Sequence, residues 1–239
     1  MTWSSRRGST LPIEALIFDV DGTLAETEEF HRRAFNAAFT TLGLDWFWDR
    51  PLYADLLKVT GGRERIRHFM DHYLSGTGEA RDMVALLHQR KNRVYAGFVA
   101  NRQVPLRPGM RELIAAAQGA GLKLAIATTT SPANVDALLT AALGSGWREV
   151  FPVMVAGDMV KAKKPAPDVY HAALARLRVA PEAALAIEDS RNGVLSATGA
   201  GLRVAAVRSA YTAQDDLSGA VRVFDDPVDL TLASLRALA

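Results

Sequence analysis

Two aspartates, Asp19 and Asp21, stand two residues apart directly after a short apolar run, residues 15–18. Such a run is typical of a strand buried on both faces of a parallel sheet, and ligands bind open α/β sheets where their strands end. Two carboxylates so close together need a cation or a shared proton. Carboxylate oxygens suit Mg²⁺, so the pair predicts a magnesium site. A solvated turn is the alternative, because Asp and Gly are common turn residues.

Polar side chains follow two further apolar runs that predict strands. These side chains are Thr128, Thr129, Thr130 and Ser131 after residues 122–127, and Glu188 and Asp189 after residues 183–187. Between the two runs, Lys164 precedes a helical pattern. One such strand end can arise by chance, but four in order indicate a shared site, because parallel strands end at one edge of their sheet.

The elements that must position these residues alternate between strand and helix. Predicted strands cover 15–18, 122–127, 153–156, 183–187, 204–207 and 221–224, and predicted helices cover 110–120, 133–143, 168–177 and 192–200. This alternation predicts an α/β fold, with a Rossmann-like parallel sheet and helices on both faces.

A long helical segment interrupts this pattern between residues 27 and 104. Apolar stripes with a helical period cover 29–44 and 82–99, a loop is expected at 75–78, and the cluster at 46–48 is expected to pack within the helices. We therefore expect a flexible N-terminal tail over 1–12, a catalytic core formed by 13–26 and 105–239, and an inserted helical cap over 27–104.

Composition excludes several classes of protein. The 239 residues are 49% hydrophobic and 23% charged, as in globular proteins, and they include no cysteine, which excludes disulfides and thiolate catalysis. No apolar run approaches the ~20 residues of a membrane span, and the first ten residues lack the apolar centre of a secretory signal. A net charge of +2 without basic and aromatic residues interleaved argues against nucleic-acid binding. We expect a cytoplasmic monomer.

The ordered motifs resemble those of the haloacid dehalogenase superfamily, in sequence order and over nearly the whole chain after about residue 13. Three features resemble the β-phosphoglucomutase-like branch: residues 23–28, the helical insert and the Thr60-Gly61-Gly62-Arg63 segment. Together with 46–48 and 127–131, they are most similar to the CbbY-type phosphatases. This resemblance implies hydrolysis of xylulose 1,5-bisphosphate, an inhibitory by-product of Rubisco chemistry.

The resemblance gives each core residue a role. It implies that Asp19 is the nucleophile, which forms an aspartyl phosphate, and that Asp21 protonates the leaving alkoxide and later deprotonates water. Mg²⁺ would take the Asp19 carboxylate, the Asp21 main-chain carbonyl and the Asp189 carboxylate, with Glu188 either a ligand or an outer partner. Thr128 and Lys164 would bind the transferring phosphoryl group. The acid at position 21 favours an alcohol leaving group over a halide.

Specificity is expected from the cap, because the core motifs contact only the phosphoryl group. Glu28 and His31 share one helix face, and His31 is either a partner of the site or a plain surface residue. Gly62 and Arg63 open a helix, where amides and a guanidinium suit a second phosphate. The remaining substrate-binding candidates are Tyr53, Arg67, Thr129, Thr130, Ser131 and Asn134; Asn134 alternatively only caps its helix. Lys161 and Lys163 are expected to be solvated neighbours of Lys164.

Three functions therefore remain open from the sequence. The first is a phosphatase for a small sugar bisphosphate, with phosphoglycolate as a further possible substrate. The second is a phosphosugar mutase, which uses the same aspartyl phosphate but returns the phosphoryl group to sugar. The third is a catalytically silent module that binds sugar phosphates, and the presence of both Asp19 and Asp21 argues against it.

Overall fold

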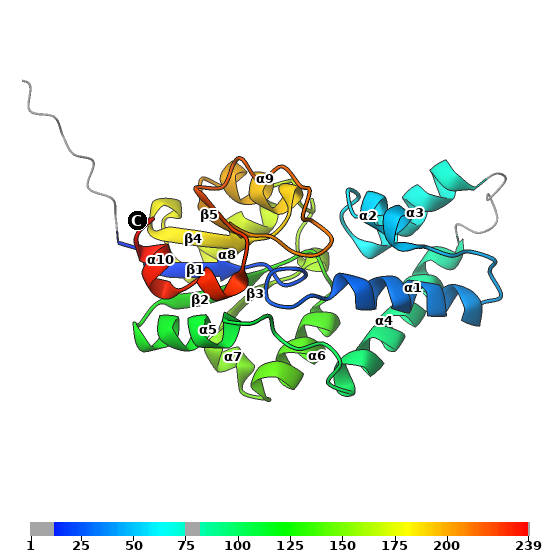
Figure 1. The fold of residues 1–239 in the computed structure, drawn as a ribbon, viewed down its shortest axis with the longest axis horizontal. Coiled ribbons are helices and arrows are strands. Elements are labelled where there is room, and N and C mark those ends of the chain that lie inside the picture. Colours follow the sequence, from blue (N-terminus) through cyan, green and yellow to red (C-terminus); the bar gives the residue numbers. More distant parts are fainter. Residues whose placement is uncertain (1–11, 75–81, 239) are drawn as a thin grey trace, which may run out of the picture.

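The computed structural model describes residues 12–74 and 82–238. Six parallel strands form one sheet in the order β3-β2-β1-β4-β5-β6 (Figure 1). The strands are β1 (Ala15–Phe18), β2 (Lys123–Ala127), β3 (Val153–Val155), β4 (Ala184–Glu188), β5 (Arg203–Val207) and β6 (Arg222–Phe224). Every predicted strand is present with ends within one residue, and the predicted α/β fold with a parallel sheet is confirmed.

Ten α-helices and three short 3₁₀ helices lie wholly within the described ranges. The α-helices are α1 (Glu28–Thr41), α2 (Arg50–Leu56), α3 (Gly62–Tyr73), α4 (Val84–Ala100), α5 (Met110–Gly119), α6 (Pro132–Leu143), α7 (Trp147–Val150), α8 (Asp168–Leu177), α9 (Arg191–Gly199) and α10 (Leu232–Arg236). The 3₁₀ helices are η2 (Gly157–Met159), η3 (Pro181–Ala183) and η4 (Pro227–Asp229). The expected tail and the expected loop at 75–78 lie almost wholly outside the described residues.

The central strand β1 is fully buried because helices cover both faces of the sheet. Leu16 and Phe18 point into one core, where they meet residues of α5, α6, α7 and α10. Ala15 and Ile17 point into the other core, formed with α8 and α9. Figure 1 shows these two helical layers on opposite sides of the sheet. The alternation of side chains along the strand thus builds two cores.

Helices α1–α4 form a separate group beyond the sheet (Figure 1). Their apolar faces meet in a third core of aromatic and aliphatic residues, in which the rings of Phe35 and Trp48 lie 4.6 Å apart. The prediction that residues 46–48 pack together holds for Trp48 but is wrong for Phe47, whose side chain is 69% exposed. This position follows from the chain between α1 and α2, which turns only its alternate side chains inward.

Helix α2 was not among the predicted helices, because seven residues are too few to show a helical stripe. Its start nevertheless carries two local signals. The Asp49 carboxylate accepts a hydrogen bond from the Leu52 amide at 2.8 Å, and Pro51 occupies the first turn. An N-cap aspartate followed by proline is a common helix start, so these residues could have indicated α2.

Candidate active site

The polar residues predicted from the strand ends meet at one edge of the sheet. Asp19 follows β1, Thr128 follows β2, and Glu188 ends β4, while Lys164 comes from the loop before α8. All four are buried, and the Asp189 side chain beside Glu188 is buried too. The parallel register of β1 with β2 and with β4 brings these ends side by side. The sheet therefore assembles residues that are more than 160 positions apart in the sequence.

Lys164 lies at the centre of this cluster. Its Nζ donates to Asp19 Oδ1 and to Glu188 Oε1, at 2.6 Å each, and to the Ala127 carbonyl at 2.9 Å. All three donor positions of the ammonium are used. Although burial favours the neutral amine, the two carboxylates outweigh it and raise the Lys164 pKa. The lysine therefore stays charged next to Asp19.

Asp189 lies close to Asp19, and two hydroxyl groups hold its carboxylate. Asp189 Oδ2 accepts hydrogen bonds from Ser209 Oγ at 2.8 Å and Thr212 Oγ1 at 2.9 Å. Burial and the Glu188 charge raise the Asp189 pKa to about 8, despite these bonds. Burial also raises the pKa of Asp19 well above its usual range, against the pull of Lys164. Two buried acids with raised pKa values mark a site short of positive charge.

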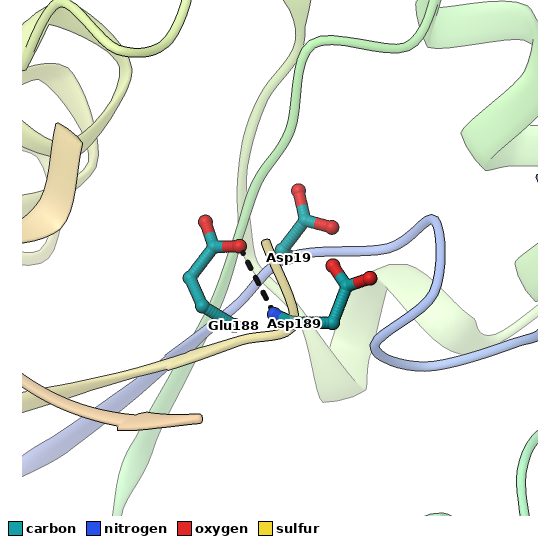
Figure 2. Close-up of side chains that lie close together, drawn as sticks. All are labelled: Asp19, Glu188 and Asp189. Atoms are coloured by element: carbon teal, nitrogen blue, oxygen red, sulfur yellow. Dashed lines mark hydrogen bonds between the residues drawn. The ribbon is translucent and has the colours of Figure 1, made fainter. Parts of the chain in front are cut away.

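The donor set fits a hard divalent cation. Asp19, Glu188 and Asp189 each offer an oxygen within 4.8 Å of the others, and all three side chains are buried. In Figure 2 the Asp19 and Asp189 carboxylates both lie to the right of the Glu188 carboxylate. Glu188 Oε1 already accepts from Lys164 and from Tyr170, and Oε2 accepts from the Asp189 amide at 3.3 Å. Asp19 and Asp189 are therefore the carboxylates best placed to bind such a cation.

Asp21 has a different environment from Asp19. Its Oδ1 accepts a hydrogen bond from Thr27 Oγ1 at 2.5 Å and lies 3.1 Å from His31 Nε2. Burial alone would raise the Asp21 pKa, but His31, Thr27 and Lys91 outweigh it and lower it to about 2. Asp21 is thus ionised when the site contains no substrate. The geometry therefore supports the prediction that His31 is a partner of the site, and not the alternative that it is a plain surface residue.

These residues line a cavity of about 490 Å³ between the sheet and helices α1–α4. The sequence-predicted residues on its wall are Asp19, Asp21, Glu28, His31, Gly62, Arg63, Thr128, Thr129, Thr130, Ser131, Asn134, Lys164 and Asp189. The cavity thus has a carboxylate-rich end at the sheet and a second wall contributed by the helices.

Three predicted residues are absent from the wall of this cavity as the structure describes it. Tyr53 is fully buried behind it and donates through its hydroxyl to Glu28 at 2.7 Å, so it supports Glu28 and does not face the cavity. Arg67 is exposed and does not line the cavity, although it lies one helical turn after Arg63 on α3. Glu188 lies beneath Lys164, as described above. Substrate contact by Tyr53 or Arg67 is therefore not supported.

Two local predictions also need correction. Lys163 is not solvated: its Nζ donates to both carboxylate oxygens of Glu64 on α3, at 2.9 and 3.0 Å. Asn134 does not cap its helix, because Ser131 occupies the N-cap of α6 and accepts from the Asn134 amide at 3.4 Å. The Asn134 side chain instead donates to Thr130 Oγ1 at 3.2 Å.

Sequence reasoning missed three basic residues of the helical wall: Arg65, His88 and Lys91. Lys91 is buried and its pKa is lowered to about 8, chiefly by burial. Arg65 is buried with its guanidinium donating to the Leu56 carbonyl at 3.1 Å. The signal for Lys91 was in the sequence, because it stands on the buried face of α4 between Leu87 and Tyr95. A lysine within an apolar stripe is rarely placed there for packing alone.

Comparison with known proteins gives the same family as the resemblance of the motifs. A model of the haloacid dehalogenase-like hydrolase family matches residues 13–201. Protein CbbY of Cereibacter sphaeroides is 50% identical over 219 residues, which cover 91% of this chain and 94% of that protein. Within the described residues, no helix has both the length and the apolar character to cross a membrane.

Two solved structures are similar in fold. A mutant CbbY from Rhodobacter sphaeroides, in complex with xylulose-(1,5)bisphosphate, superposes with a TM-score of 0.89 at 50% identity, covering 93% of this chain and 99% of that one. A β-phosphoglucomutase from Clostridium difficile has a TM-score of 0.80 at 20% identity, covering 95% and 96%, and shows the fold alone. The resemblance predicted from the motifs is confirmed, and the chain belongs to the haloacid dehalogenase-like hydrolase family.

Proposed function

We propose that this chain is a Mg²⁺-dependent phosphatase for a small sugar bisphosphate, with xylulose 1,5-bisphosphate as the first substrate to test. One observation carries the proposal: a single cavity joins a buried carboxylate and lysine cluster to a wall of arginine, lysine and histidine. The first end suits a phosphoryl group under attack, and the second suits a distal phosphate. The CbbY structure with xylulose bisphosphate, at 50% identity, supports the same substrate class.

The chemistry would proceed in two displacements at phosphorus. An oxygen of Asp19 attacks, the bond from phosphorus to the sugar oxygen breaks, and Asp21 gives a proton to the departing alkoxide. Asp21 then takes a proton from water, which attacks the aspartyl phosphate and releases inorganic phosphate. Lys164 holds the nucleophile at 2.6 Å and supplies a fixed positive charge.

Asp21 must be protonated for the first displacement and ionised for the second. The surrounding residues favour the ionised form, since His31, Thr27 and Lys91 lower the Asp21 pKa to about 2 against the effect of burial. A substrate dianion placed next to it favours the protonated form, because like charges raise the pKa of an acid. Donation of this proton to the departing alkoxide leaves Asp21 ionised, which is the state that a general base needs.

Mg²⁺, when bound, would neutralise charge on the phosphoryl oxygens. We propose that the Asp19 and Asp189 carboxylates and the Asp21 main-chain carbonyl hold it, with Glu188 as an outer partner through Lys164. We also propose that residues 13–26 and 105–239 form the catalytic core and that residues 27–104 form a cap. The third core, which lies within α1–α4, supports this division.

The test is release of inorganic phosphate from a panel of mono- and bisphosphorylated sugars, with Mg²⁺ and with chelator. We expect magnesium-dependent release, fastest with a pentulose bisphosphate, and none from Asp19→Asn, because an amide cannot attack phosphorus. Full activity in metal-free buffer would contradict the metal assignment. An isomerised sugar phosphate without free phosphate would instead indicate a mutase.

The distal phosphate has its own test on the cap. Arg63→Ala and Lys91→Met should each lower kcat/KM for a bisphosphate about 10- to 100-fold, because a hydrogen bond to a charged group contributes roughly 1.5–3 kcal/mol. A monophosphate should lose far less. Arg67→Ala is the matched control, since Arg67 is an exposed arginine on the same helix as Arg63, but only Arg63 lines the cavity. Equal losses with both substrates would assign these residues to cap structure.

A further inference from the structure

Arg107 is a buried arginine outside the cavity whose side chain joins three separate segments near the site. It lies in the chain that returns from α4 to α5, and its side chain is 6% exposed. The guanidinium donates to the Gly22 carbonyl and to the Arg208 carbonyl, and Nε lies 3.3 Å from Glu26 Oε1. These partners are 85, 101 and 81 positions away, so the contacts exist only in the folded protein.

Both main-chain partners of Arg107 adjoin residues of the site. Gly22 directly follows Asp21, and Arg208 directly precedes Ser209, whose hydroxyl holds Asp189 Oδ2 at 2.8 Å. The guanidinium therefore fixes one peptide next to the proposed acid and another next to the hydroxyl that orients a proposed metal ligand. A guanidinium spreads five N–H donors over a rigid planar fork, and the compact ammonium of lysine cannot reproduce that geometry.

Arg107 is also attached to both chain segments that lead to α1–α4. Its amide donates to the Leu24 carbonyl at 2.8 Å, and the neighbouring Leu106 pairs with Ala25 in an antiparallel bridge. Glu26, the ionic partner of Arg107, belongs to the outgoing segment. The two segments are thus joined to each other and, through one side chain, to the loops that carry Asp21 and Ser209.

We propose that Arg107 is a positioning residue, which holds Asp21 and Asp189 in register with the two segments that connect the sheet to helices α1–α4. This inference rests on the proposed function for its effect on turnover. Loss of the guanidinium leaves a buried carbonyl at Gly22 and a partly buried one at Arg208 without their donor, and each loop then relaxes independently. A displacement of about 1 Å at reacting groups can cost about 10²-fold in rate.

The test compares Arg107→Lys with Arg111→Lys. Arg111 lies four residues further on, is exposed, and donates to the Ala142 carbonyl at the surface. For Arg107→Lys we expect kcat to fall about 10- to 100-fold, with KM for the sugar phosphate within about twofold, because Arg107 does not line the cavity described here. Arg111→Lys should leave both constants unchanged.

Hydrogen–deuterium exchange gives a second readout that does not depend on turnover. Amides in segments 19–26 and 203–214 should exchange faster in Arg107→Lys and at the wild-type rate in Arg111→Lys. A folded Arg107→Lys protein that keeps kcat within about twofold, or that exchanges both segments at the wild-type rate, overturns the inference. If this variant does not fold, Arg107→Gln is judged by the same two criteria. Because exchange is measured without substrate, failure of the proposed phosphatase activity is distinguishable from failure of the inference.

Discussion

Replacing Gly193 by alanine sets two opposing effects against each other within one helix. Gly193 lies in α9, where alanine is favoured over glycine by about 1 kcal/mol. A Cβ at this position, however, would lie 1.9 Å from Glu188 Oε2 and 2.1 Å from Glu188 Cδ. These separations are far below a van der Waals contact, so Glu188 must move. Because Glu188 is buried and bonded to Lys164, it has little freedom to do so.

The size of the loss depends on how far Glu188 is displaced. Overpacking costs about 1–3 kcal/mol, and breaking a buried ion pair costs about 3–5 kcal/mol. After the helix gain of about 1 kcal/mol is subtracted, we expect Gly193→Ala to lose about 1 kcal/mol if Glu188 keeps Lys164. The loss should reach about 4 kcal/mol if the pair breaks, because the same helix gain is subtracted from the upper end of that range. The sign is therefore destabilising in both cases, and kcat should fall because Lys164 also holds Asp19.

Urea unfolding of Gly193→Ala and Gly199→Ala measures the difference directly. Gly199 ends the same helix, and a Cβ there would lie 3.6 Å from Pro167 Cβ, an ordinary contact. Gly199→Ala should therefore be neutral or gain up to about 1 kcal/mol with unchanged kcat. If Gly193→Ala were as stable and as active as this control, the packing of Glu188 against α9 would be refuted.

Three further predictions concern the pH dependence of stability, the ion pair between Lys163 and helix α3, and acid catalysis. Hydrogen bonds from Arg32, with further help from Tyr211, lower the Glu29 pKa to about 2; this stabilisation should be present above about pH 4.5 and lost as the pH falls towards 2. The difference in unfolding free energy between wild type and Glu29→Gln, followed by urea titration, should shrink over that range. Lys163→Ala removes the ion pair to α3 and should raise KM a few-fold with little change in kcat, since a partly exposed pair contributes at most about 1 kcal/mol; Lys161→Ala, at an exposed neighbour, is the control, and an equal change there would contradict the contact. Asp21→Asn should lower kcat at least about 10²-fold in steady-state phosphate release, and a near-normal kcat with an alkyl phosphate would exclude Asp21 as the acid.

The sheet and its catalytic edge were predictable because their signals are local. Each buried strand is an apolar run, and a parallel sheet brings the ends of such runs to one edge. Asp19, Thr128 and Asp189 follow their strands directly, so their meeting required only the topology. Lys164 was recognisable by its order among them. Every predicted strand lies within one residue of the structure for the same reason.

The second wall of the cavity was only partly predictable, because helix surfaces carry weaker signals than strand ends. A stripe on α1–α4 shows which face is apolar, but not which polar residue on the edge of that stripe faces the sheet. Tyr53 and Arg67 were therefore assigned to the cavity, whereas Arg65, His88 and Lys91 were missed. For Lys91 one signal is present in the sequence, because it is a basic residue within the apolar face of α4.

The sequence by itself determined the fold class and the family, and it predicted which residues would meet at the phosphoryl end, since each of these follows from residue type and order. Only the tertiary structure decided which carboxylates are free for a metal. Lys164, in the loop before α8, and Tyr170, within α8, both donate to Glu188 Oε1. The tertiary structure also decided the contacts of Arg107, whose partners are brought together by the sheet and by the two segments that connect it to α1–α4. Such contacts depend on long-range geometry, which no local pattern of residues encodes.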